Sequence, residues 1–232
     1  MAEAVAFTHL RSVLAGRLPV LAIFDLDGTL VDSVPDIAHA LDEALRAAGL
    51  AVVGEARVRC WVGRGSRTLV CDALEHVLGV EPSQAQADAL LAAYLARYRE
   101  RCTTLTRALP GAGELLDALV GCGVRLACVT NKPAQIATRV TDHVFPATHF
   151  EVLVGGDSGA GVKPAPGPLQ AALVRLGVDA ADAVLVGDSR HDVHAARAAS
   201  VAVVCVANGY NHGEDVRDEH PDLMVESLYE LL

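Results

Sequence analysis

Several features that mark common protein classes are scarce or missing in this sequence. Only 4% of its residues are aromatic, and no segment approaches the roughly 18 consecutive apolar residues of a membrane span. No segment is polybasic, and the formal net charge is −10. We therefore expect neither nucleic-acid binding nor attachment to an anionic membrane, because both need clustered basic groups.

The cysteines and the N-terminal segment argue against a secreted protein. None of the six cysteines stands in a C-x-x-C pair, and a chain of 232 residues can bury a stable core without disulfides. Residues 1–18 carry scattered charged and histidine residues, which is unlike a secretory signal peptide. We expect reduced thiols, a cytoplasmic location and either a monomer or a homodimer, and we assign no role to residues 1–18.

Short runs of β-branched and apolar residues recur along the chain, with helical stretches between them. The runs cover residues 20–24, 124–129, 152–154, 183–186 and 201–206. This alternation is typical of βαβ units. It predicts an α/β fold whose core is a doubly wound parallel sheet with helices on both faces.

A long interval with no strand signal separates the first run from the second. Residues 37–45 have apolar residues at helical spacing, with Ser33 and Asp36 as the expected cap pair and Gly49 as the stop. Further helices are expected over 64–78 and 83–101. We interpret residues 34–106 as a helical cap domain inserted into an α/β core domain of residues 1–33 and 107–232.

Polar residues follow the apolar runs, where ligands of open α/β sheets bind. They are Asp25 and Asp27 after the first run, Thr130 and Asn131 after the second, Lys163 beyond the third, and Asp188 with Asp192 after the fourth. If these groups converge, four carboxylates and one ammonium carry a net formal charge of −3. A buried site does not hold that charge unaided, and oxygen-only ligands favour Mg²⁺.

Such a site is suited to phosphoryl transfer. Asp25 is expected to be the nucleophile, because an ionised carboxylate needs no base, and Lys163 would screen its repulsion from a phosphate. We expect neighbouring carboxylates to raise the proton affinity of Asp27, which could then act as general acid and base. The hydroxyl of Thr130 would hold phosphate oxygens, Asp188 would bind the metal, and Asp192 would bind or orient it.

These residues, in this order, resemble the four signature motifs of the haloacid dehalogenase-like phosphatases. The matching segments are Phe24-Asp25-Leu26-Asp27-Gly28-Thr29-Leu30, Val129-Thr130-Asn131, Lys163-Pro164 and Gly187-Asp188-Ser189-x-x-Asp192. The resemblance implies an aspartyl-phosphate intermediate on Asp25 and a helical cap that closes over the site. It also implies Mg²⁺ bound by Asp25, Asp188 and the backbone carbonyl of Asp27.

Less specific motifs are most similar to the bacterial phosphoglycolate phosphatases, a group within that family. They include Trp61-Val62-Gly63-x-Gly65, Thr130-Asn131-Lys132-Pro133 and Gly209-Tyr210-Asn211-x-Gly213. This likeness implies hydrolysis of 2-phosphoglycolate, a small phosphorylated carboxylate. We expect Thr130, Asn131 and Lys163 to bind the phosphate end, and we hypothesise that Arg64 pairs with the substrate carboxylate.

Other functions stay open at this point. The protein could hydrolyse another small phosphomonoester, such as a sugar phosphate or a nucleotide, or could transfer the phosphoryl group as a mutase. A non-catalytic phosphate-binding module is a further alternative, although it would have no need of Asp25 together with Asp27. A dehalogenase fits less well, because it would need neither an acid at Asp27 nor a metal.

Overall fold

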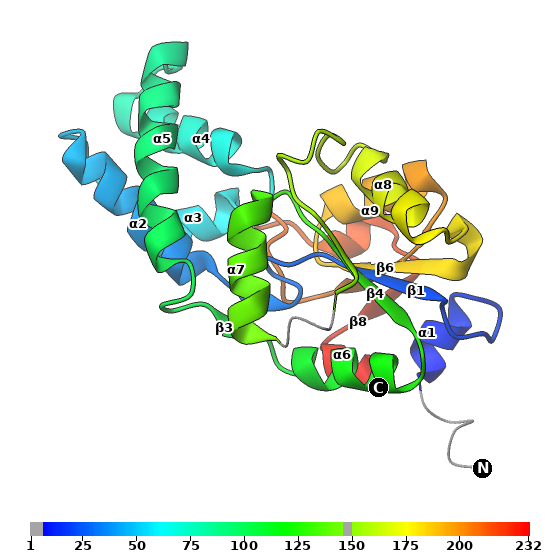
Figure 1. The fold of residues 1–232 in the computed structure, drawn as a ribbon. Coiled ribbons are helices and arrows are strands. Elements are labelled where there is room, and N and C mark those ends of the chain that lie inside the picture. The colour runs from blue at the N-terminus through cyan, green and yellow to red at the C-terminus, as the bar shows by residue number, and fades with distance from the viewer. Residues whose placement is uncertain (1–6, 146–149) are drawn as a thin grey trace.

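Six parallel strands form the central sheet of the computed structural model, which describes residues 7–145 and 150–232. In spatial order the sheet runs β5-β4-β1-β6-β7-β8 (Figure 1). Its strands are β1 (Leu21–Phe24), β4 (Arg125–Val129), β5 (Val152–Val154), β6 (Ala183–Gly187), β7 (Ala202–Val206) and β8 (Leu223–Val225). Five of them match the apolar runs to within a residue or so, and the predicted parallel α/β sheet is confirmed. The sequence analysis missed β8, which is three residues long.

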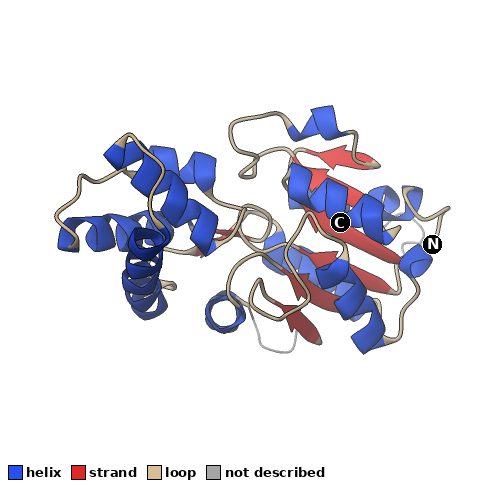
Figure 2. Ribbon diagram, turned by 90° about the horizontal axis from the view of Figure 1, so that it is seen from above, coloured by secondary structure: helices blue, strands red, loops and turns tan. Residues whose placement is uncertain are grey.

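Helices cover both faces of this sheet (Figure 2), so its strands are buried on two sides. The flanking helices are α1 (Thr8–Ser12), α6 (Ala112–Gly121), α7 (Ala134–Val144), α8 (Gly167–Leu176) and α9 (Arg190–Ala199). Three 3₁₀ turns complete this part, η1 (Ala180–Asp182), η2 (Val216–Glu219) and η3 (Leu228–Leu231).

Alternate residues of β1 point into two separate hydrophobic cores. Ala22 and Phe24 belong to the core that includes α1, α6 and α7, whereas Leu21 and Ile23 belong to the core under α8 and α9. This alternation follows from the two-residue period of a strand. It explains why the sequence reads as an unbroken apolar run, because each face needs its own apolar residues.

Four further helices lie to one side of the sheet (Figure 1), and we call them the cap helices. They are α2 (Val34–Ala47), α3 (Glu55–Trp61), α4 (Ser66–Leu78) and α5 (Gln84–Arg101). The chain leaves and re-enters the sheet region through a two-stranded antiparallel ribbon of β2 (Val31–Asp32) and β3 (Arg107–Ala108). The sequence analysis missed α3 and this ribbon. The division into domains at residues 34 and 106 stays a prediction.

The predicted cap pair of α2 is wrong. Ser33 occupies the N-cap position but makes no capping hydrogen bond. Its hydroxyl is instead bonded to Asp27 Oδ1, and Asp36 accepts hydrogen bonds from Leu105 and Thr106. Both side chains therefore serve long-range contacts that a local motif cannot reveal.

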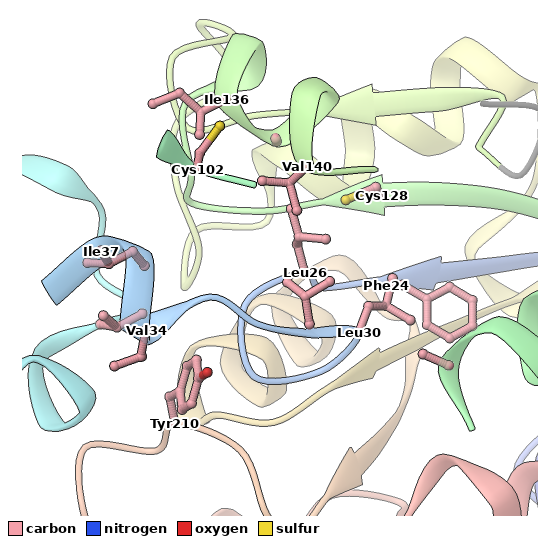
Figure 3. Packing of buried hydrophobic residues seen from close by; sticks show 14 of the residues in the cluster. Phe24, Leu26, Leu30, Val34, Ile37, Cys102, Cys128, Ile136, Val140 and Tyr210 are labelled. Carbon is pink, nitrogen blue, oxygen red and sulfur yellow. The ribbon is translucent and has the colours of Figure 1, made fainter. Parts of the chain in front are cut away.

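The cap helices share a continuous hydrophobic cluster with the sheet. Val34 and Ile37 of α2 belong to the same cluster as Leu26 and Leu30, which follow β1, and all four are labelled in Figure 3. Tyr210, from the loop after β7, lies at the same junction. Helix α2 is therefore packed against the loop that carries the first acidic pair.

The N-terminal helix packs against the C-terminal turn. Phe7 donates its backbone N–H to the carbonyl of Leu232, and Leu10 is fully buried. The ring of His9 is 2.7 Å from the carbonyl oxygen of Glu230. Within the described residues, no helix has both the length and the apolar character that crossing a membrane requires.

Candidate active site

The strand register brings the predicted site residues to one edge of the sheet. Phe24, the last residue of β1, pairs with Cys128 on one side and with Val186 on the other. The residues that directly follow these strands therefore meet at the carboxyl edge. Asp25, Thr130 and Asp188 all follow strands at this edge, and all three are buried.

Three carboxylates and one ammonium form the centre of this edge. Each of Asp25, Asp188 and Asp192 has a carboxylate oxygen within 4.8 Å of the others. Lys163 Nζ lies 2.9 Å from Asp25 Oδ1 and 2.6 Å from Asp192 Oδ1. These groups come together from three segments that are distant in sequence.

Asp188 is fixed by its surroundings on several sides. Its Oδ1 accepts a 2.9 Å hydrogen bond from the Thr29 hydroxyl, and its Oδ2 accepts one from the backbone N–H of Tyr210. Gly209 must lack a side chain, because a Cβ there would lie 2.0 Å from the Asp188 Cβ. Gly28 has a φ of +88° and faces the same carboxylate.

Asp192 has both of its oxygens occupied. Oδ1 pairs with Lys163, while Oδ2 accepts hydrogen bonds from the hydroxyl and the backbone N–H of Ser189. The second set makes a capping box at the start of α9. These contacts position Lys163, and the predicted role of Asp192 in binding or orienting a metal stays a prediction.

The donor set fits a hard divalent cation. Burial raises the pKa of Asp25 to about 6, with repulsion from Asp192 and Asp27 adding to the shift and Lys163 opposing it. Burial, together with repulsion from Asp192 and Asp25, raises the pKa of Asp188 well above its usual range. A carboxylate cluster with this much uncompensated charge and only oxygen donors has the chemistry of a Mg²⁺ site.

Lys163 stays charged despite its burial. Burial by itself would lower the pKa of this ammonium, but the carboxylates of Asp192 and Asp25 outweigh it and raise the pKa. Lys163 also favours the ionised form of Asp192, whose pKa lies below its ordinary value although burial opposes this. The ammonium is therefore a permanent positive charge beside the candidate nucleophile.

Asp27 does not belong to the three-carboxylate cluster. Its Oδ1 lies 2.8 Å from Lys132 Nζ and also accepts the Ser33 hydroxyl. Lys132 is thus a cationic neighbour of Asp27 beside the expected carboxylates, and the role of Asp27 as general acid and base stays a prediction. With Lys132 included, the four carboxylates and two ammonium groups carry a net formal charge of −2. Lys132 belongs to the Thr130-Asn131-Lys132-Pro133 motif, but its contact with Asp27 is not predictable from that motif.

A small cavity of about 40 Å³ lies between this edge and the cap helices. The sheet side of its wall contains Asp25, Asp27, Thr130, Asn131 and Lys132. The cap side contributes the following residues: Ile37, Val62, Gly63, Gly65, Ser66, Leu69, Tyr94 and Tyr98. The cavity thus has one polar, charged wall and one largely apolar wall.

Two predicted ligand-binding residues have other partners in this structure. The Asn131 amide donates to the backbone carbonyls of Gly63, 2.8 Å away, and of Lys163, 2.9 Å away. It therefore ties the cap to the loop that carries Lys163. The guanidinium of Arg64 pairs with Asp72 and does not line the cavity. Their predicted contacts with substrate stay predictions.

A cluster at the ribbon between sheet and cap also escaped the sequence analysis. Asp32 accepts a hydrogen bond from the Tyr210 hydroxyl and pairs with Arg59 of α3 at 3.4 Å. The Arg59 guanidinium lies over the Tyr210 ring, 5.2 Å from its centre. Because the Tyr210 backbone also donates to Asp188, this cluster links a cap helix to the three-carboxylate cluster.

Comparison with known proteins gives a consistent result. Residues 22–206 match the model of the haloacid dehalogenase-like hydrolase family. A phosphoglycolate phosphatase of Nitrosococcus oceani is 38% identical over 215 residues, which are 93% of this chain and 96% of that protein. Phosphoglycolate phosphatase 1 of Pseudomonas aeruginosa is 39% identical over 94% of this chain and 80% of its own.

A solved structure agrees with these matches. The crystal structure of a predicted phosphoglycolate phosphatase from Haemophilus somnus superposes with a TM-score of 0.84 at 31% identity. The superposition covers 91% of this chain and 95% of that one. Its coverage includes both the sheet and the greater part of the inserted helices.

Proposed function

This chain belongs to the haloacid dehalogenase-like hydrolase family, and we propose that it hydrolyses 2-phosphoglycolate to glycolate and inorganic phosphate. The observation that carries this proposal is the contact of Asp25 with Lys163 at 2.9 Å, inside a cluster of three buried carboxylates. The curated relatives that carry the name phosphoglycolate phosphatase support the choice of substrate.

We assign Mg²⁺ to the carboxylates of Asp25 and Asp188 and the backbone carbonyl of Asp27, with Asp192 positioning Lys163. When bound, the ion would neutralise carboxylate charge and reduce the repulsion between Asp25 and the incoming phosphate. Three neighbouring carboxylates, of which Asp25 and Asp188 have raised pKa values, support this assignment. The hydroxyl of Thr130, which lines the cavity, would hold a phosphate oxygen.

The first half-reaction transfers the phosphoryl group to the protein. A carboxylate oxygen of Asp25 forms a bond to phosphorus while the bond from phosphorus to the glycolate oxygen breaks. Asp27 donates its proton to that leaving oxygen, so glycolate departs with a neutral hydroxyl group. Lys163 holds Asp25 in place and offsets negative charge on the phosphoryl oxygens.

The second half-reaction restores the enzyme. Asp27, now ionised, takes a proton from a water molecule, and the resulting hydroxide forms a bond to phosphorus. The bond between phosphorus and the Asp25 oxygen breaks, which releases inorganic phosphate and regenerates the carboxylate. The apolar cap wall of Ile37, Val62, Leu69 and Tyr94 would limit access of bulk water during both steps.

The test is a measurement of phosphate release from 2-phosphoglycolate, glucose 6-phosphate and adenosine monophosphate. We expect the highest kcat/KM for 2-phosphoglycolate, loss of activity with a chelator, and recovery with added Mg²⁺. A mutase would release little net phosphate, and a binding module would release none. A cytoplasmic location and the choice between monomer and homodimer stay predictions.

A further inference from the structure

Lysine occurs at only two positions in this sequence, although the chain has 19 basic residues. Both lysines are buried, Lys132 with 5% and Lys163 with 3% of its surface exposed. A buried ammonium is costly unless anions or hydrogen-bond acceptors surround it. Lys163 has two carboxylate partners, Asp25 and Asp192. Lys132 stands on the other side of Asp27 and has a different environment.

The Lys132 ammonium is held by one core residue and one cap residue. It lies 2.8 Å from Asp27 Oδ1 and donates a hydrogen bond to the hydroxyl of Tyr98 on α5. It also lies 4.8 Å from the centre of the Tyr98 ring. An ammonium has three N–H donors, and these two contacts account for two of them.

Lys132 is the sole cationic side chain in the cavity wall, taking residues 7–145 and 150–232 into account. Asp25 and Asp27 lie in the same wall, and the cap side is mostly apolar. A substrate with a phosphate and a carboxylate would bring further negative charge into this space. Arg64 offers no compensation there, because its guanidinium pairs with Asp72.

We propose that the Lys132 ammonium binds the carboxylate of the substrate and thereby selects phosphorylated acids. This inference rests on the proposed function, because it places the phosphate at Asp25 and the leaving oxygen at Asp27. In 2-phosphoglycolate a single methylene group separates the leaving oxygen from the carboxylate carbon. An ammonium that already contacts the Asp27 carboxylate is therefore within reach of that carboxylate.

The cap contributes through aromatic side chains on α5. Tyr94 is stacked on Tyr98, with ring centres 5.5 Å apart and an angle of 13° between the ring planes. Burial raises the pKa of both phenols well above 10, so they are neutral hydroxyl groups and do not compete as anions. Tyr98 therefore positions Lys132 only while the cap helices lie over the sheet edge. Recognition of the substrate carboxylate would therefore need both the sheet edge, which carries Lys132, and the cap helices, which carry Tyr98.

The test compares two substrates of nearly equal size, 2-phosphoglycolate and its uncharged amide, 2-phosphoglycolamide. We expect the wild-type protein to prefer the acid in kcat/KM by about tenfold or more, as a charge-assisted hydrogen bond would give. Lys132→Met should reduce this preference about ten- to a hundredfold. Because the preference is a ratio of two kcat/KM values, any general loss of activity that follows from changes at Asp27 cancels.

Two cap variants accompany this measurement. Arg97→Met, on the same helix as Tyr98, should keep the wild-type preference, because its guanidinium bonds only the Ala93 carbonyl among the described contacts. Arg64→Met tests the rival assignment. If Arg64→Met abolishes the preference and Lys132→Met does not, the carboxylate belongs to Arg64 and the inference is overturned.

A binding measurement covers the case in which Lys132→Met has too little activity to assay. Calorimetry would compare 3-phosphonopropionate with propylphosphonate, which lacks the carboxylate. Lys132→Gln, which still donates a hydrogen bond to Asp27, replaces Lys132→Met if the latter does not fold. We expect either variant to lose about ten- to a hundredfold of the preference for 3-phosphonopropionate. An unchanged preference would refute the inference, whereas a wild-type protein that releases no phosphate from 2-phosphoglycolate would refute the proposed function instead.

Discussion

Asp36 and Thr106 are 70 residues apart in sequence, and a single carboxylate oxygen of Asp36 joins them. This Oδ2 accepts hydrogen bonds from the backbone N–H of Thr106 at 2.8 Å and from its hydroxyl at 2.9 Å. It also accepts the backbone N–H of Leu105 at 2.8 Å. The chain that enters the cap helices is thus tied to the chain that leaves them.

Replacing Asp36 with Ala should destabilise the protein. Asp36 is fully buried, so the variant would leave the N–H groups of Leu105 and Thr106 without their acceptor. We expect the free energy of unfolding to fall by about 2–4 kcal/mol in urea titrations. Asp42→Ala is the control, because Asp42 also accepts two backbone N–H groups but is only half-buried. Equal losses in the two variants would contradict this explanation.

Asp25→Asn should abolish turnover while the fold persists. The amide has nearly the same shape as the carboxylate, but it is a poor nucleophile for phosphorus, so we expect kcat to fall by about 10³-fold or more. Removing one of three clustered carboxylates relieves repulsion, and Lys163 keeps its contact with Asp192. The free energy of unfolding without metal should therefore not decrease by more than about 1 kcal/mol. Steady phosphate release by this variant would exclude Asp25 as the nucleophile.

Gly209→Ala should damage the metal site directly. The new Cβ would lie 2.0 Å from the Asp188 Cβ, so the aspartate must move. We expect Mg²⁺ to bind more weakly, so that the Mg²⁺ concentration giving half-maximal activity rises about tenfold or more. The added buried methyl group should also cost about 1–3 kcal/mol of stability.

The matched control for this change is Gly113→Ala on α6. A Cβ at Gly113 would meet no atom within 4 Å, and the position is helical. The protein should become more stable by about 0.4–1 kcal/mol, with unchanged Mg²⁺ dependence. If both variants had the same effect on Mg²⁺ dependence, close packing against Asp188 would not be its cause.

Acid should destabilise the protein through His212. The ring Nδ1 of His212 lies 3.0 Å from the carbonyl of Cys60, and its Nε2 lies 3.2 Å from His191 Nε2. Burial lowers the pKa of His212 below its usual 6.5, the positive charges of Arg64 and Arg190 act in the same direction, and the hydrogen bond to the Cys60 carbonyl opposes them without reversing the shift. The folded state thus binds this proton less readily than the unfolded state does.

The resulting stability is present above pH 6.5 and decreases as the pH falls below it. We expect the wild-type free energy of unfolding to decrease between pH 7.5 and pH 5.5. The free energy of unfolding of His212→Gln should decrease less over the same range, because glutamine cannot take up the proton. Parallel pH profiles for the two proteins would show that His212 does not contribute.

The sequence predicts the sheet edge well because strand ends and polar residues coincide there. Asp25, Asp188 and Lys163 each follow a short apolar run or its loop, and parallel strands bring such ends together whatever the details of packing. The order of the motifs then identifies the family. These predictions depend on topology, which the pattern of apolar runs largely determines.

The contacts of individual side chains are harder to predict. The direction of the Asp27 side chain decides whether it faces carboxylates or Lys132, and no sequence period encodes that direction. Tyr98 reaches Lys132 only because α5 packs over the sheet edge, which is a tertiary contact. The ribbon strands are two residues long, too short for any alternating pattern.

The scarcity of lysine gives this protein a practical advantage for spectroscopy. A sample carrying isotope-labelled lysine in an otherwise unlabelled chain would show only two side-chain ammonium signals in a magnetic resonance spectrum, one from Lys132 and one from Lys163. One signal would come from the cavity wall and the other from the ammonium beside Asp25, without mutation or a chemical tag. Titrating such a sample would reveal separately when the phosphate end and the carboxylate end of a bound molecule become occupied.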